Sequence, residues 1–190
     1  MIKNKKMDYQ NLWDTAVIDP AAINNIKAVR AKILAHQNRY ESVATSLKNN
    51  MPWWIIAVIH YREANLDFTG NLANGDPLTA RTVNEPKGRP LVGNPPFTWE
   101  FAAVDALQER NLQNITSWDI VTILSELEKY NGTGYIKNHP SVLTPYLWSK
   151  TNHYTRGKYS SDGHFDPNLV DKQIGCMPLI RYITDKTLQS

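Results

Sequence analysis

Residues 52–63 have the sequence PWWIIAVIHYRE and contain the most apolar run of the chain, Trp53 to Ile59. Pro52 suits the first position of a helix, and the helix that follows is apolar on nearly every side until His60. Such a helix must be buried, so we expect it at the centre of the core. The apolar run has only about seven residues, far fewer than a membrane span needs.

Amphipathic helices are predicted on both sides of this central helix. Upstream, a long helix is expected from Pro20 to about Leu47, with Asp19 as its N-cap. One face of it carries the apolar residues Ile23, Ile26, Val29, Ile33 and Leu34. Downstream, helices are expected at three places: Thr98 to about Leu112, Ser117 to about Tyr130, and Asn168 or Leu169 to about Thr187 with a bend at Pro178.

Two long irregular stretches separate the predicted helices. Residues 65–97 are rich in Gly, Asn and Pro and contain the turn signals NGDP, KGRP and GNPP. Residues 78–83 within them are predicted to form a strand of a small hairpin or sheet. Residues 130–167 are crowded with Tyr and polar residues. Long irregular stretches inside a compact domain are usually functional, so we expect both to face one cleft.

Composition narrows the class of protein. The 190 residues are 42% hydrophobic and 21% charged, which is typical of one folded domain. The net charge is only +3, and the sequence has no dense run of basic residues of the kind that nucleic-acid binding usually needs. The single cysteine, Cys176, excludes an internal disulfide and a multi-cysteine zinc site. No glycine-rich phosphate loop follows a predicted strand, so nucleotide binding has no support.

The first residues predict where the protein is made. The basic start MIKNKKM is followed by DYQNLWD and not by the apolar run of a secretory signal. We therefore expect synthesis in the cytoplasm without a signal peptide. Any work outside the cytoplasm would then follow release or export by another route.

Glu63 is the sharpest candidate for chemistry. A carboxylate near a helix C-terminus meets the negative end of the helix dipole, and apolar neighbours desolvate it. Both effects raise its pKa, and a protonated Glu near neutral pH is what general-acid cleavage of a glycosidic bond requires. The alternative is an ordinary surface pair with Arg62 or Arg81.

Several stretches resemble the lysozyme and lytic-transglycosylase superfamily. The run IIAVIHYREANLDF is similar to the buried helix that ends in that family's catalytic Glu, although Ala64 stands where Ser is common. Tyr130 and Asn131, in YNGTGY, are similar to the Tyr-Asn-Gly element of lytic transglycosylases. The stretches NGDPLTARTVNEPKGRP and PYLWSKTNHYTRGKY look like a subgroup of phage or prophage endolysins. The resemblance spans about residues 50–175.

This resemblance implies a mainly α, lysozyme-like α+β fold, with a small β-hairpin or sheet after the helix ending at Glu63. It implies a single catalytic domain over residues 1–190, with residues 1–48 as an N-terminal helical extension. The implied activity is that of a muramidase, which cuts the β-1,4 bond between N-acetylmuramic acid and N-acetylglucosamine in peptidoglycan. Glu63 is then the general acid, no cofactor is needed, and we expect a monomer that binds glycan strands.

A second catalytic group is less sharply indicated. The acidic candidates are Asp67, Asp76, Glu85, Asp162 and Asp166. Asp76 follows Glu63 by thirteen residues, a spacing similar to goose-type lysozymes, where an acidic residue positions water. The alternative is turn chemistry, because Gly-Asp-Pro is a good turn. Without a second acid nearby, a lytic transglycosylase that forms 1,6-anhydro products becomes possible.

Sugar-binding residues are predicted from aromatic and amide side chains in the irregular stretches. Aromatic faces stack on sugar rings, and amides and hydroxyls supply hydrogen bonds. The candidates are Thr79, Tyr130, Asn131, Tyr135 and Tyr146. The alternative is that such aromatics only pin a loop, which we favour for Trp148.

Three other functions remain open at this point. A chitinase- or chitosanase-type glycosidase would need the same acid. A non-catalytic wall-binding protein would keep the groove and not need Glu63. A metal-dependent wall peptidase would use His60, His153 or His164, but no tight ligand spacing favours one. A nucleophilic role for Cys176 has less support, since buried thiols are commonly inert.

Overall fold

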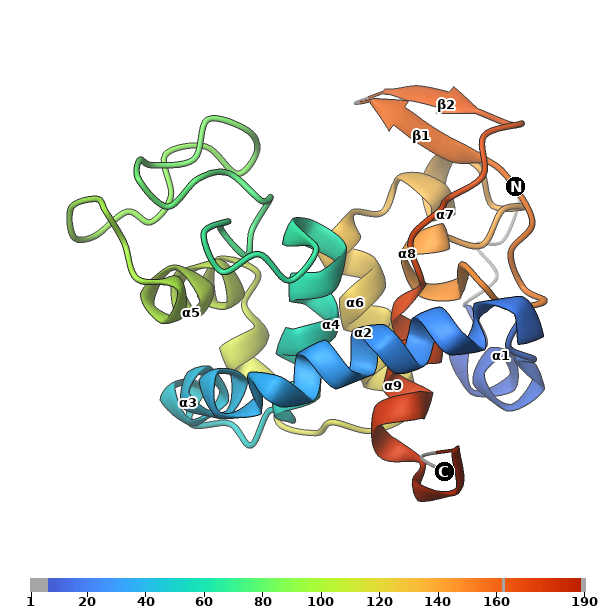
Figure 1. Ribbon diagram of the computed structural model, residues 1–190. Helices are drawn as coiled ribbons and strands as arrows, with labels where there is room; N and C mark the ends of the chain where they lie inside the picture. Colours follow the sequence, from blue (N-terminus) through green and yellow to red (C-terminus); the bar gives the residue numbers. More distant parts are fainter. Residues whose placement is uncertain (1–6, 162, 189–190) are drawn as a thin grey trace.

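The computed structural model describes residues 7–161 and 163–188, and over these the protein is mainly α-helical (Figure 1). The helices are α1 (Tyr9–Thr15), α2 (Ile23–Ala35), α3 (Gln37–Leu47), α4 (Trp53–Ala64), α5 (Trp99–Glu109), α6 (Ile120–Asn131), α7 (Gly134–Asn138), α8 (Pro145–Trp148) and α9 (Cys176–Thr184). Short 3-10 turns cover Pro20–Ala22, Leu112–Asn114 and Lys186–Leu188. The strands β1 (Lys158–Ser161) and β2 (His164–Asp166) form a two-stranded antiparallel sheet.

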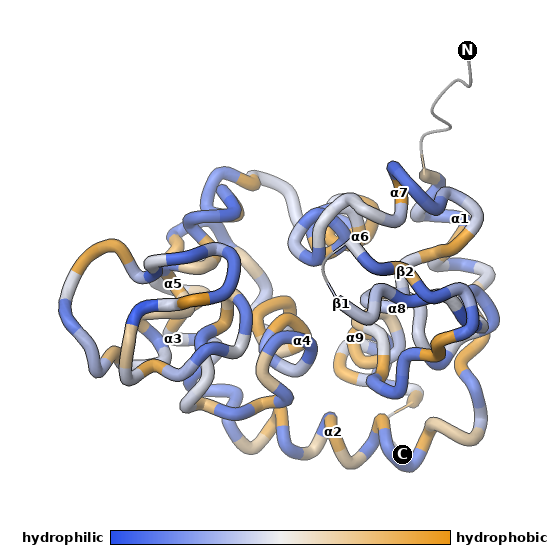
Figure 2. The backbone as a smooth tube through the Cα atoms, turned by 90° about the horizontal axis from the view of Figure 1, so that it is seen from above, coloured by the Kyte–Doolittle hydropathy of each residue, from blue (hydrophilic) through white to orange (hydrophobic). Residues whose placement is uncertain are grey.

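The α4 helix confirms the predicted central helix. Ile55 through Ile59 are at most 2% exposed. α3 packs on one side of α4 and α9 on the other, and α4 and α9 carry much of the apolar colour in the middle of the view in Figure 2. Asn65 ends α4 in the left-handed conformation, which turns the chain into residues 65–97.

The single long helix predicted for residues 20–47 is wrong. The chain breaks at His36, so that a 3-10 turn and α2 precede a separate α3. α2 packs against α9, whereas α3 packs against α4 and α5. One straight helix could not reach both surfaces, and burial outweighs the continuous helical pattern. The predicted cap is confirmed, since the Asp19 carboxylate accepts a hydrogen bond from the Ala21 amide at 2.9 Å.

The later helices form in the predicted parts of the chain, but their ends differ from the predicted ends. Thr98 caps α5 as predicted, and α6 begins after Asp119 rather than at Ser117. The last helix begins at Cys176, because residues 168–175 run without helix around the buried Asp171. Pro178 lies in the first turn of α9, where its missing N–H breaks no helical hydrogen bond, so the expected bend has no cause there.

The predicted position of the β element is also wrong. The described residues 65–97 contain no strand, only an isolated bridge between Gly70 and Pro77. The prolines of this stretch lack the N–H donors that a ladder needs. The backbone amides of Val83 and Asn84 donate to the Asp76 carboxylate, so they too are not available for a strand ladder. The sheet lies instead at β1 and β2, where Lys158 pairs with Asp166 and Tyr159 with Phe165.

These elements place the end of α4 between the two irregular stretches. In Figure 1 the green residues 65–97 rise on one side of α4, and the orange segment with α7, β1 and β2 lies on the other. Within the described ranges, no helix is both long and apolar enough to cross a membrane.

Candidate functional site

Glu63 lies in the last turn of α4 and is half-buried. It lines a pocket of about 330 Å³. The other residues that line this pocket are Ala64, Asp67, Thr69, Gly70, Gly75, Pro77 and Thr79. The structure therefore brings the predicted acid and the predicted sugar-binding Thr79 into one pocket.

Tyr146 holds the carboxyl group of Glu63. Its hydroxyl donates a hydrogen bond to Glu63 Oε1 at 3.0 Å from α8, 83 residues away in the chain. Burial raises the pKa of Glu63 to about 7, although the Tyr146 hydrogen bond and the charge of Arg62 act in the opposite direction. Glu63 can therefore be protonated near neutral pH while Tyr146 orients it.

The alternative reading of Glu63 as half of a surface ion pair lacks a partner among the described residues. Arg62 pairs with Asp171 at 2.7 Å, and the Arg81 guanidinium donates to the carbonyl of Gly93. The carboxyl of Glu63 thus keeps its contact to a neutral hydroxyl.

Gly75 brings the following loop against the backbone of Glu63. Its φ of +79° is in the left-handed region, and a Cβ atom there would lie 2.7 Å from the Glu63 carbonyl oxygen. Only glycine suits both the conformation and the close approach. The turn signal NGDP in the sequence therefore marks the wall of the site.

Asp76 is buried and its carboxylate is saturated with donors. Oδ2 accepts hydrogen bonds from the amides of Val83 and Asn84, at 2.8 and 2.9 Å, and from the Asn74 side chain. Oδ1 accepts from the Asn84 side chain at 2.6 Å. Burial alone would raise the pKa of Asp76, but these hydrogen bonds outweigh it and lower the pKa. The geometry favours the turn role of Asp76, and its role as a base stays a prediction.

Asp67 is the second carboxylate in the Glu63 pocket. It is exposed, and the hydrogen bonds from the amide and hydroxyl of Thr69 both reach Oδ1. These bonds hold the pKa of Asp67 below its usual value. The buried His60 contacts the Asp67 carbonyl oxygen through Nε2 at 3.0 Å, which fixes the backbone at this point. Asp67 therefore offers an ionised carboxylate beside the acid.

A second pocket, of about 480 Å³, is lined by Tyr146, whose hydroxyl contacts Glu63 of the first pocket. Three of the predicted sugar-binding residues line it, namely Asn131, Tyr135 and Tyr146. Its other lining residues are Arg62, Gly132, Gly134, Asn138, Pro145, Lys158, Tyr159, Ser161, Gly163 and Asp171. Phenol rings, amides and cations thus meet in the second pocket.

Tyr130 differs from the other predicted sugar-binding residues. It is 4% exposed and lines neither pocket. Its hydroxyl donates to the carbonyl of Leu72 at 3.0 Å. Tyr130 therefore links α6 to the irregular stretch of residues 65–97 and anchors that stretch.

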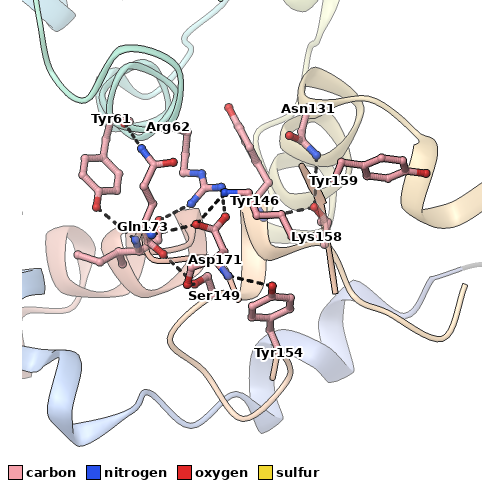
Figure 3. A network of polar contacts seen from close by, with 12 residues as sticks. Tyr61, Arg62, Asn131, Tyr146, Ser149, Tyr154, Lys158, Tyr159, Asp171 and Gln173 are labelled. Carbon is pink, nitrogen blue, oxygen red and sulfur yellow. Dashed lines mark hydrogen bonds and ion pairs between the residues drawn. The ribbon is translucent and has the colours of Figure 1, made fainter. Parts of the chain in front are cut away.

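A buried polar network supports the floor of the second pocket (Figure 3). Asp171, 1% exposed at its side chain, accepts from Arg62 Nη2 at 2.7 Å and lies 3.4 Å from Lys158 Nζ. Arg62 also donates to the carbonyl of Ile174, and Tyr61 accepts a hydrogen bond from the Ile174 amide. The network ties the last turn of α4 to the segment before α9.

The remaining candidates lie elsewhere. Glu85 is exposed and pairs with Lys87, Asp166 caps the turn at Asn168, and Asp162 lies outside the described residues. His153 bonds to the Leu12 carbonyl and His60 to Tyr40. Among the described residues, no group of three or more His, Cys, Asp or Glu is placed to hold a metal ion. Cys176 is buried, which raises the pKa of its thiol and keeps it unreactive.

The sequence reading missed Arg62, Lys158 and Asp171 as a cluster. Arg62 and Asp171 are 109 residues apart, and no local pattern links them. Tyr146 was predicted as a sugar ligand, and its contact with Glu63 was not foreseen.

Taken together, the site offers a protonatable Glu, an ionised Asp and an aromatic pocket with surplus donors. This arrangement can protonate a leaving oxygen and bind hydrogen-bonding rings on aromatic and amide side chains. Comparison of the chain with protein-family models, curated proteins and solved structures finds no match.

Proposed function

We propose that the protein is a muramidase that cleaves the β-1,4 bond between N-acetylmuramic acid and N-acetylglucosamine in peptidoglycan, with Glu63 as the general acid. The observation that carries the proposal is the half-buried Glu63 carboxyl, whose pKa of about 7 lets it donate a proton near neutral pH. Tyr146 orients this carboxyl toward a pocket, and Asn131 and Tyr135 line the second pocket.

The group that serves the other face of the sugar is proposed to be Asp67. It shares the Glu63 pocket, and its Oδ2 has no hydrogen-bond donor among the described residues. Asp76, in contrast, already accepts four hydrogen bonds. An ionised Asp67 can activate water for hydrolysis. If it does not, the C6 hydroxyl of the muramic acid ring attacks the anomeric carbon in place of water, while Glu63 protonates the leaving oxygen, and the product is a 1,6-anhydro sugar.

The test is Glu63→Gln, assayed by loss of turbidity of purified cell walls. Because general-acid help is worth roughly 10²–10⁴-fold, the variant should lose at least that much rate and still fold normally. Glu41→Gln, a variant at an exposed position on α3, serves as the control and should keep the wild-type rate. Near wild-type cleavage by folded Glu63→Gln would contradict the proposal.

Mass spectrometry of wild-type digests separates the two chemistries. Hydrolysis leaves reducing ends, whereas transglycosylation leaves products lighter by one water. Release of soluble sugars from chitin, with no effect on cell walls, would instead favour the chitinase alternative.

A further inference from the structure

The second pocket carries an excess of positive charge next to the candidate acid. Of the described residues that line it, Arg62, Lys158 and Asp171 bear charges. Two cations therefore share one carboxylate, and the cluster has a formal charge of +1.

The two cations are not equivalent. Arg62 is 6% exposed at its side chain and makes the short contact to Asp171, so it neutralises the buried carboxylate. Lys158 lies at the longer distance of 3.4 Å, and its side chain is 34% exposed. An ammonium group that is partly open to the pocket, beside a carboxylate already neutralised, is free to bind a further anion.

The rest of the pocket suits a sugar that carries this anion. Tyr135 and Tyr159 both line the pocket and meet edge to face, with ring centroids 5.2 Å apart. Asn131 and Asn138 supply amide donors. The Arg62 Nε–H is buried and has no hydrogen-bond partner among the described residues, which marks unused donor capacity in the same wall.

We propose that Lys158 is a specificity-determining residue that binds a carboxylate on the sugar next to the cleaved bond, so that the site prefers acidic amino-sugar chains to neutral ones. This inference rests on the proposed function, because it assigns the second pocket to the same substrate. The carboxylate can belong to the lactyl ether of a muramyl sugar or to a peptide attached to it.

The test measures binding by calorimetry to full-length Glu63→Gln protein, which should not cleave the ligands. Three probes separate the sources of the anion: an N-acetylglucosaminyl–N-acetylmuramic acid disaccharide, the same disaccharide with a dipeptide, and neutral chitobiose. We expect at least one acidic probe to bind roughly tenfold more tightly than chitobiose, the effect of one charge-assisted hydrogen bond. Salt at 0.5 M, roughly the range where the screening length falls to a few ångströms, should shrink this difference.

Adding Lys158→Gln should remove the preference and leave chitobiose binding unchanged, whereas Lys158→Arg should retain it. Lys137→Gln on α7, an exposed lysine that does not line the pocket, is the matched control. Equal affinity of the parent protein for acidic and neutral probes, including no measurable affinity for either, overturns the proposal. So does a Lys158→Gln variant that keeps the preference, or one that loses affinity for all probes alike. Cleavage of cell walls by wild-type protein and its loss in Glu63→Gln are scored separately, so failure of the proposed function is recognised on its own.

Discussion

The two segments beside Glu63, residues 65–97 and residues 132–171, are held in place by different forces. Residues 65–97 are held by hydrogen bonds between backbone groups and buried side chains, with Asp76, Tyr130 and His60 as anchors. Residues 132–171 are held by stacked rings and by the buried Asp171 cluster. For example, His139 stacks on Phe165 with ring centroids 3.6 Å apart. The first segment lines the pocket at Glu63, and the second lines a pocket with charged and aromatic side chains.

The largest expected loss of stability comes from disrupting the Asp171 cluster in the second segment. Asp171→Asn should lower the free energy of unfolding by about 3–5 kcal/mol, because it leaves the buried Arg62 guanidinium without its counter-charge. Urea denaturation measures the change. Glu85→Gln, which removes an exposed pair with Lys87, should cost less than about 1 kcal/mol. Similar losses in both variants would show that the Asp171 cluster is no stronger than a surface pair. The double variant Arg62→Met/Asp171→Leu should recover much of the loss.

The next largest loss of stability is expected from removing the Asp76 carboxylate, which anchors the first segment. Asp76→Ala should cost about 2–3 kcal/mol, because the amides of Val83 and Asn84 lose their shared acceptor. Hydrogen exchange at these two amides reports the loss locally. Asp67→Asn should change stability by less than about 0.5 kcal/mol, since the site is exposed. Its wall-cleavage rate should nevertheless fall roughly 10²–10⁴-fold if Asp67 is the base. The reverse pattern, a rate loss in Asp76→Asn and none in Asp67→Asn, would return the base to Asp76.

Acid acts on the first segment through two groups, His60 and Glu63, whose effects on stability oppose one another. Burial lowers the pKa of His60 to about 4, so the unfolded chain binds more protons between about pH 4 and 6.5, and His60 makes stability fall as the solution is acidified through this range. The pKa of Glu63 is raised to about 7, so its contribution has the opposite sign between about pH 4.5 and 7. In Glu63→Gln the slope of unfolding free energy against pH should therefore be steeper than in wild type, by at most about 1.4 kcal/mol per pH unit.

Urea titrations at pH 4.5, 5.5 and 6.5 provide the measurement. His60→Gln, which does not titrate, should flatten the slope. The pKa of Asp171 lies below its usual value, because the charge of Arg62 outweighs the effect of burial. The second segment should therefore keep its ion pair across the same range, and early loss of its hydrogen-exchange protection would contradict this difference.

The smallest effect concerns the hydrogen bond that joins the second segment to Glu63. Tyr146→Phe removes the hydrogen bond that lowers the pKa of Glu63, so the alkaline limb of the pH–rate profile should move up by roughly half to one pH unit. Tyr135→Phe, which lines the second pocket without contacting Glu63, should leave the limb in place. A downward shift in Tyr146→Phe, or none, would show that Tyr146 does not control the protonation of Glu63.

Local patterns were sufficient for the parts of the molecule that depend on neighbouring residues. The apolar run of residues 53–59 predicted the buried α4, and Asp19 and Thr98 were predicted as caps, because capping and helical burial are read from adjacent positions. The same run marked Glu63 as the acid candidate. Gly75 was visible only as part of a turn signal, although its position against Glu63 is what the site requires.

Tertiary structure alone decided the break at His36, the place of the sheet and the partners of the site. α2 and α3 separate because they pack on different helices, a fact absent from their own periodicity. Asp76 became a turn anchor, and Asp67 entered the pocket, because the fold brings donors from residues 83 and 84 to one carboxylate and leaves the other open. Tyr146, Lys158 and Asp171 reach the end of α4 from about 80 to 110 residues away along the chain. Contacts of that separation arise from the packing of whole elements, and no spacing in the sequence encodes them.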